Sequence, residues 1–216
     1  MKNAPLSSTG KRPYHSRVRQ RQAEETHQRI LDAARELLLS KGYASTTLEM
    51  IAELAEVSPK TISAVFGSKR GILAELINPA AFGKHFQQLR GDMLATSDPQ
   101  QRLALVAKMT RQAYESFIPA FELLRTASAV APELTELSRQ IEMRRRTNQA
   151  DVIAFLDKLG MLRCNLSLDE AVDILWSLTS YDLYHLLVIE RGWPPERYES
   201  WLVQLLIEQL IEPANE

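Results

Sequence analysis

Apolar residues between positions 46 and 77 repeat with helical spacing and predict two short helices around a tight turn, followed by a third helix. Thr47 is placed to cap the first helix, because its hydroxyl accepts a bond from an otherwise unpaired amide. Ser58 caps the second helix, and Pro59 suits its first position, where no amide donor is needed. The apolar face of the first helix comprises Leu48, Ile51, Ala52 and Ala55.

The second helix of this pair has two apolar residues, Ile62 and Phe66, spaced to face inward. Its remaining positions are small or polar and are left outside: Lys60, Thr61, Ser63 and Ala64. Two helices around a short turn, with such an outer face, indicate a helix-turn-helix DNA reader. The alternative at this point is a packing corner inside an all-α domain.

The rest of the chain also follows a helical period and predicts an all-α fold of about nine helices. A first helix from Glu24 to Ser40 buries a stripe of Ile30, Ala33, Ala34, Leu37 and Leu38. Asn78-Pro79 interrupts the helix after the pair and forms a joint. Beyond this joint we expect helices over residues 80–95, 99–117, 120–129, 132–159, 167–191 and 196–211, with a break at Ile118-Pro119.

Composition agrees with a helical protein of a reducing compartment. The 216 residues include 8 glycines and one cysteine, Cys164, so no internal disulfide framework is expected and a cytoplasmic location is favoured. No apolar run is long enough to span a membrane. The net charge is −1, but residues 1–23 carry six basic and no acidic groups. This arm, with its prolines and serines, is predicted to be disordered and able to contact DNA phosphates; the alternative is an ordinary solvated tail.

The segment from Ile30 to Leu76 resembles the DNA-binding domain of the TetR (tetracycline-repressor) family of bacterial transcription regulators. The resemblance is carried by ILDAARELLLSKGYASTTLEMIAELAEVSPKTI and by FGSKRGILAEL. This chain differs from the family pattern in the turn, where Glu56 replaces a usual glycine. Ser63 stands where the family usually has a tyrosine, and Val65 replaces a common His, Tyr or Ala. These differences mean that the operator preference of relatives does not carry over.

After the basic arm at 1–23, the resemblance implies a helix-turn-helix domain at 24–78 with its motif at 47–66, and a helical ligand-binding and dimerisation domain at 79–216. It implies a homodimer that binds a palindromic DNA operator. It also implies a small-molecule effector that releases the protein from DNA, so that the protein is a ligand-released repressor. The alternative is a dimeric small-molecule-binding protein with only weak, non-specific DNA binding. The residues it assigns to DNA are Thr46, Thr47, Ser58, Pro59, Lys60, Thr61, Ser63, Ala64 and Lys69.

The resemblance also implies an effector pocket in the C-terminal domain. Its expected lining is Phe86, Met109, Ala113, Tyr114, Phe117, Phe121, Arg125 and Trp176, each of which is otherwise ordinary core. Arg125 has two readings, contact with an anionic ligand or an ion pair with a glutamate. The run Arg144-Arg145-Arg146 is interpreted as a solvated helix face rather than a nucleic-acid site.

The last two predicted helices are apolar over more than one face, which indicates either burial within the chain or a four-helix dimer interface. The expected interface residues are Leu175, Leu183, Leu187, Leu202, Leu205 and Leu206. Enzyme chemistry finds no support, because the four histidines have no metal-ligand spacing and no nucleophile motif or phosphate-binding glycine loop is present. No metal or cofactor is expected.

Overall fold

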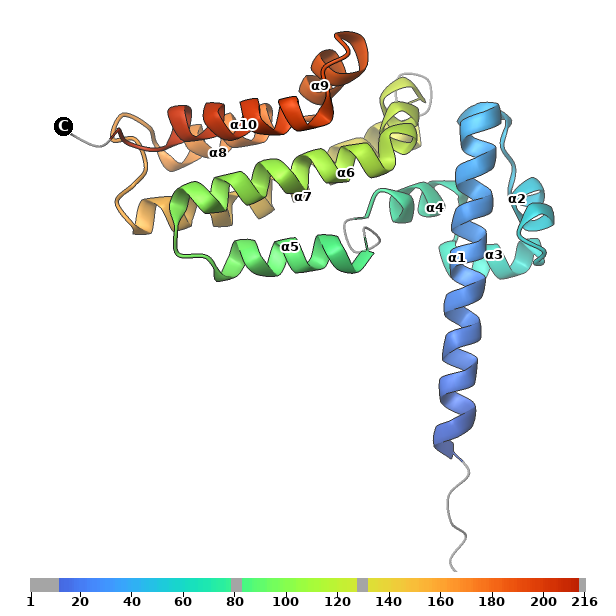
Figure 1. Cartoon of the computed structure of the whole chain (residues 1–216). Coiled ribbons are helices and arrows are strands. Elements are labelled where there is room, and N and C mark those ends of the chain that lie inside the picture. The colour runs from blue at the N-terminus through green and yellow to red at the C-terminus, as the bar shows by residue number, and fades with distance from the viewer. Residues whose placement is uncertain (1–11, 79–82, 128–131, 214–216) are drawn as a thin grey trace, which may run out of the picture. The chain divides into compact units, whose positions relative to one another are not determined.

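The computed structural model describes residues 12–78, 83–127 and 132–213, and only the backbone of residues 12–18, 83, 117, 127 and 133 (Figure 1). Helices are the regular elements of the described residues, which otherwise hold connecting loops and one antiparallel bridge between Leu162 and Ile211, so the all-α prediction is confirmed. The helices are α1 (Arg12–Ser45), α2 (Leu48–Leu54), α3 (Pro59–Phe66), α4 (Lys69–Leu76), α5 (Gly83–Ala95), α6 (Pro99–Ala127), α7 (Pro132–Lys158), α8 (Leu168–Leu178), α9 (Tyr181–Tyr184), the π-helix η2 (His185–Glu190) and α10 (Pro195–Leu210).

The chain divides into two compact units, residues 1–72 and 73–216. This boundary lies inside α4 and not at the predicted joint after residue 78. A break in helical sequence marks where a helix ends, whereas the boundary of a unit depends on which residues pack together. Pro79 itself lies outside the described residues.

Helix α1 is longer than the sequence pattern predicts. It begins at Arg12 and not near Glu24, so the predicted disordered arm is helical from residue 12 onward. Residues 12–23 are rich in arginine and glutamine, which favour helices, but they have no apolar stripe from which to detect a helical period. The regular turns end as predicted at Gly42, where φ is 76° and ψ is 171°. The predicted buried stripe of α1 is confirmed, with every member at most 9% exposed.

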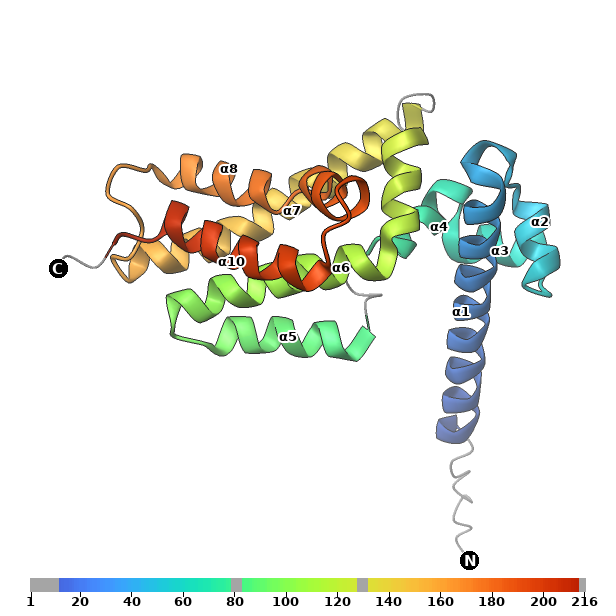
Figure 2. The same ribbon diagram turned by 45° about the horizontal axis from the view of Figure 1, so that its top comes forward.

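In the second unit, α6 packs against both α5 and α10, while α7 packs against α8 (Figure 2). Helix α6 continues through Pro119, where the sequence predicts a break between two helices. Proline removes one helical hydrogen bond, which packing on both sides of it can offset. Tyr114 and Phe121, on either side of Pro119, both contact the ring of Tyr181, with centroids 5.1 and 5.0 Å away.

The predicted single helix at 167–191 is divided in the structure. It stops at Thr179, and Ser180 starts α9 by accepting a bond from the Leu183 amide at 3.3 Å. The Thr179 hydroxyl is buried and donates to the Leu175 carbonyl at 2.6 Å. No glycine or proline marks this break, so the sequence pattern runs through it.

Candidate DNA-binding surface and ligand pocket

The turn between α2 and α3 closes through two backbone hydrogen bonds. The Val57 amide donates to the Ala52 carbonyl at 2.9 Å, and the Glu56 amide donates to the Glu53 carbonyl at 3.2 Å. This is the Schellman pattern, which requires a left-handed residue between the helices. Glu56 takes that role with φ 53°, the only described non-glycine residue with positive φ. The difference from the family's glycine therefore strains the turn without preventing it.

Both predicted caps are confirmed. The Thr47 hydroxyl accepts from the Met50 amide at 3.3 Å, and the Ser58 hydroxyl accepts from the Thr61 amide at 3.1 Å. Ser58 and Thr61 also share a hydrogen bond between their hydroxyls at 2.8 Å. The two N-termini are thus fixed, and amides near a helix N-terminus attract phosphate.

The outer face of α3 consists of short side chains around one cation. Pro59, Lys60, Ser63 and Ala64 are exposed, Thr61 is half-buried, and Ile62 is fully buried against the domain core. Val65 is 48% exposed on the same short helix, an apolar residue that the sequence pattern did not assign to this surface. A helix with short side chains can approach base edges closely, and apolar groups can contact thymine methyls.

Two residues predicted to contact DNA hold the domain together instead. Thr46 is 0% exposed, and its hydroxyl donates to the Gly42 carbonyl at 2.8 Å. The Lys69 ammonium donates to the carbonyls of Tyr43 and, at 2.7 Å, Thr46, and lies 4.1 Å from the centre of the Tyr43 ring. Both polar groups serve the corner after α1, so the fully buried Thr46 hydroxyl is not available to DNA, while a DNA contact by the half-buried Lys69 stays a prediction.

Charge is divided unequally between the two units. Residues 1–72 contain twelve of the 26 basic and seven of the 27 acidic residues, a formal net charge of +5. Residues 73–216 hold the remaining 14 basic and 20 acidic residues, a net charge of −6. The near-zero total charge is therefore the sum of a basic helix-turn-helix unit and an acidic second unit. Binding to a phosphate backbone requires a basic surface of this kind.

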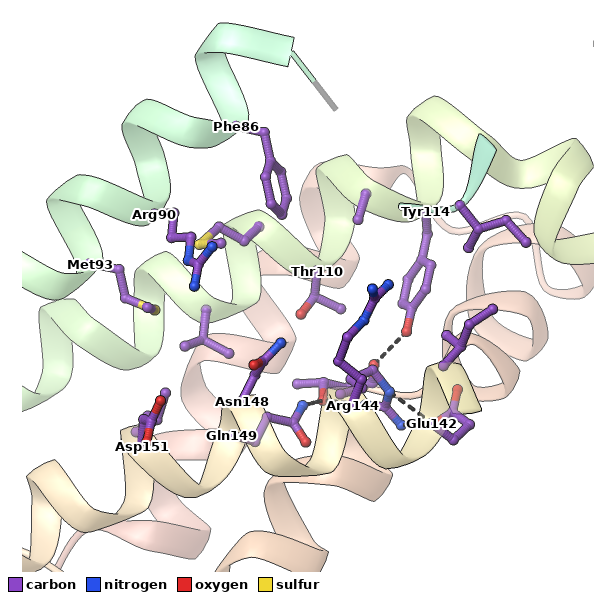
Figure 3. Close-up of a pocket in the computed structure, with 18 of the residues that line it drawn as sticks. Phe86, Arg90, Met93, Thr110, Tyr114, Glu142, Arg144, Asn148, Gln149 and Asp151 are labelled. Atoms are coloured by element: carbon purple, nitrogen blue, oxygen red, sulfur yellow. Dashed lines mark hydrogen bonds and ion pairs between the residues drawn. The ribbon is translucent and has the colours of Figure 1, made fainter. Parts of the chain in front are cut away.

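A pocket of about 230 Å³ opens in the second unit among α5, α6 and α7 (Figure 3). Five of the eight residues predicted for an effector site line it: Phe86, Met109, Ala113, Tyr114 and Phe121. Arg125 and Trp176 do not line this pocket. Arg125 pairs with Glu122 at 3.1 Å, and the Trp176 ring nitrogen donates to Glu142 at 2.8 Å. The Phe117 side chain lies outside the described residues.

The floor of the pocket is a buried polar network centred on Thr179. The Tyr114 hydroxyl donates to the Thr179 carbonyl at 2.8 Å, and burial raises the pKa of Tyr114. The Thr179 hydroxyl accepts from the Gln149 amide nitrogen at 2.6 Å and from Arg145 at 2.9 Å. Arg145 also pairs with Glu142 at 2.7 Å. The network fixes the side chains of α6, α7 and α8 around the pocket.

The triple arginine of α7 is not a single solvated face. Successive helical residues point about 100° apart, so the three side chains reach three different surroundings. Arg144 lines the pocket, Arg145 joins the Thr179 network, and Arg146 pairs with Asp173 of α8 at 2.9 Å. Sequence reasoning missed Arg90, Arg144 and Gln149 as pocket residues, because polar positions on a helix read as solvent-facing.

Half of the predicted dimer interface is buried inside the domain. Leu175, Leu202 and Leu206 are all 0% exposed and belong to its core, so they are not available to a partner. Leu183, Leu187 and Leu205 are half-buried. Two residues of η2 that were not predicted, Leu186 and Ile189, are 49% and 42% exposed. The apolar surface therefore lies at η2 and includes Leu205 of α10.

Metal-binding groups and membrane-spanning helices are both absent from the part of the chain that the structure describes. No three His, Cys, Asp or Glu residues gather there in a metal-binding group. None of the described helices is long and apolar enough to cross a membrane. Cys164 is exposed as a free thiol.

Fold and site thus define a class, the all-α proteins with a helix-turn-helix unit and a second helical unit that carries a pocket. Residues 30–76 match the family described as bacterial regulatory proteins of the tetR family. YvkB of Bacillus subtilis, an uncharacterized helix-turn-helix-type transcriptional regulator, is 43% identical over 70 residues, which cover 32% of this chain and 37% of YvkB. The match thus spans little more than a third of that relative. The helix-turn-helix unit is thus similar to those of TetR-family regulators.

Solved structures extend the likeness in fold to most of the chain. A protein of Syntrophomonas wolfei described as a TetR-family transcriptional regulator has a TM-score of 0.71 and 20% identity, covering 85% of this chain and 93% of that one. The regulator FadR of Bacillus subtilis, in complex with stearoyl-CoA, has a TM-score of 0.66 and 18% identity, covering 84% and 98%. At these identities the likeness shows a shared fold.

Proposed function

We propose that the protein is a sequence-specific DNA-binding transcriptional regulator that binds a palindromic operator as a homodimer. The observation that carries this proposal is the exposed outer face of α3. The helix belongs to a helix-turn-helix whose turn is closed by two backbone hydrogen bonds, in a unit of net charge +5. The family of the helix-turn-helix unit agrees with it.

In this proposal α3 is the reading helix in the major groove. Lys60 reaches a base edge or a nearby phosphate, and Ala64 and Val65 contact thymine methyls. Thr47, Ser58 and Ser63, exposed at the helix starts and on α3, position the phosphate backbone. Thr46 and Lys69 support the surface from inside, through their hydrogen bonds to the corner after α1.

A dimer supplies the second reading helix. Two copies related by a twofold axis read half-sites about 34 Å apart, or a multiple of it. The exposed Leu186 and Ile189 of η2, with the half-buried Leu183, Leu187 and Leu205, are the surface we assign to the interface.

The pocket gives the regulator its signal. FadR of Bacillus subtilis has been solved with stearoyl-CoA, so this fold accommodates a ligand in that relative. Here, a small molecule that binds one arrangement of the two units better than another shifts the population and lowers the affinity for DNA. The protein is then a repressor that its ligand releases.

Selection of random duplex DNA by the purified protein, at near-physiological salt, tests the DNA-binding role. We expect one palindromic sequence to be enriched, and the enrichment to be lost in a Lys60→Ala, Ser63→Ala double variant. Lys158→Ala, an exposed lysine of the second unit, is the charge-matched control and should recover the same palindrome. Failure of the wild-type dimer to enrich any sequence would refute the proposal.

A further inference from the structure

The lining of the pocket has an apolar wall and an uneven set of charges. Phe86, Met93, Val106 and Met109 supply apolar surface from α5 and α6. The charged lining residues are three arginines and two carboxylates. One arginine and one carboxylate, Arg145 and Glu142, neutralise each other at 2.7 Å, so the charge that a ligand meets comes from the other three.

Those three residues are Arg90, Arg144 and Asp151, which leave a net charge of +1 at the pocket. Figure 3 shows Arg90 from α5 and Arg144 from α7 extending into the space between these helices. Both side chains are exposed, and neither guanidinium forms an ion pair or a hydrogen bond with the described residues. Two unpaired guanidinium groups from opposite walls suit a carboxylate, which each can bind through paired N–H donors.

One buried polar atom of the lining also lacks a partner. Gln149 is 9% exposed, and its amide nitrogen is used by Thr179, but its Oε1 accepts no hydrogen bond. In either orientation of the amide one polar end of Gln149 lacks a partner, because the Thr179 hydroxyl can bond only the other end. A buried acceptor without a donor costs about 1–3 kcal/mol, which a ligand hydroxyl or N–H group recovers.

We infer that the effector is a largely apolar organic acid that carries one hydroxyl or N–H group on its apolar body. Its carboxylate lies between Arg90 and Arg144, its body against the aromatic and methionine side chains, and its donor on Gln149 Oε1. The volume of about 230 Å³ is below the usual range of drug-sized sites, roughly 300–1,000 Å³, so the ligand is small. This inference rests on the proposed role of the pocket as the effector site.

Isothermal titration of the full-length protein without DNA tests the inference with four matched probes. They are 6-hydroxy-2-naphthoate, 6-methoxy-2-naphthoate, 2-naphthol and (6-hydroxynaphthalen-2-yl)methylamine. The hydroxy acid carries both the carboxylate and the hydroxyl donor. The methoxy acid lacks the donor, 2-naphthol lacks the carboxylate, and the amine carries a positive charge in place of the negative one. We expect the hydroxy acid to bind at least about fivefold more tightly than the methoxy acid and at least about tenfold more tightly than naphthol or the amine.

Two variants connect each preference to its residues. Gln149→Met should abolish the preference for hydroxy over methoxy and keep that for acid over naphthol. The double variant Arg90→Gln, Arg144→Gln should abolish the preference for the acid over naphthol and keep the preference for hydroxy over methoxy. Arg139→Gln is the matched control, because Arg139 lies on α7 outside the pocket and pairs with Glu136 at 2.8 Å. Near-ultraviolet circular dichroism of the tryptophans verifies that each variant is folded.

The inference is overturned if none of the four probes binds at millimolar concentration, if the amine binds best, or if the variants leave both preferences unchanged. These outcomes are independent of DNA. Selective binding of the hydroxy acid by a protein that enriches no palindrome would refute the DNA-binding role alone. A recovered palindrome with no probe bound would refute the ligand class alone.

Discussion

Glu56 lies in the turn of the helix-turn-helix with φ 53°, a conformation that costs an L-residue about 1–2 kcal/mol. Glycine adopts this conformation without strain. Glycine also raises the entropy of the unfolded chain, which lowers the gain in stability by about 0.4–1 kcal/mol. Glu56→Gly should therefore stabilise the turn by about 0.5–1 kcal/mol. The two Schellman hydrogen bonds use backbone atoms only, so the substitution leaves them intact.

Native-state hydrogen exchange of residues 48–57 measures this effect locally. The amides of Ala55 and Val57 donate within the motif, and in Glu56→Gly they should exchange about two- to fivefold more slowly. The three tryptophans all lie beyond residue 72, so their fluorescence does not report on this unit.

Two control variants separate backbone strain from charge. Glu53→Gly removes the same charge from inside α2, where glycine is unfavourable, and should speed exchange by a similar factor. Glu56→Ala removes the charge but keeps the left-handed strain, and should leave exchange close to that of the wild type. Equal effects of Glu56→Gly and Glu56→Ala would refute the argument from backbone strain.

Three further predictions concern stability. Thr46→Val leaves the Gly42 carbonyl without its buried donor and should destabilise the helix-turn-helix unit by about 1–3 kcal/mol, measured by the same exchange; no loss would mean that the hydroxyl is not structural. Lys69→Met removes the donor to the Tyr43 and Thr46 carbonyls and should cost about 2 kcal/mol, with DNA affinity falling only as far as the folded fraction falls. Burial raises the pKa of Tyr184 from 10.0 to about 12. The contribution of this neutral tyrosine to the free energy of unfolding is therefore full below pH 10 and should decline as the pH rises toward 12, which tyrosinate absorbance and circular dichroism measure. Burial shifts three more tyrosines of this core in the same direction, Tyr114, Tyr181 and Tyr198.

The sequence predicts local structure well wherever one residue decides it. Thr47 and Ser58 cap their helices because a side-chain oxygen follows directly from the sequence and needs no distant partner. The buried stripe of α1 follows from its helical period for the same reason. Pro119 and Thr179 were misjudged because packing against other helices decides whether α6 continues and where α8 stops.

Functional residues were harder to predict, because their roles depend on neighbours that are distant in sequence. Thr46 lies at a position that the family pattern assigns to DNA, but its hydroxyl donates its hydrogen bond to the Gly42 carbonyl. Arg144 and Gln149 appear as polar positions of a long helix until α5 and α6 close the pocket above them. Similarly, an apolar count does not tell Leu202, inside the domain, from Leu186, on its surface.

The central claim is that the outer face of α3 reads a DNA sequence. Its most direct test is the ratio of dissociation constants for the selected palindrome and for a scrambled duplex of the same composition, measured by fluorescence anisotropy at near-physiological salt. If α3 reads the sequence, the ratio is at least about a thousandfold, which is typical of sequence-specific DNA-binding proteins. A ratio near one, with binding that weakens steeply as salt rises, would contradict it and leave only electrostatic attraction to the phosphate backbone.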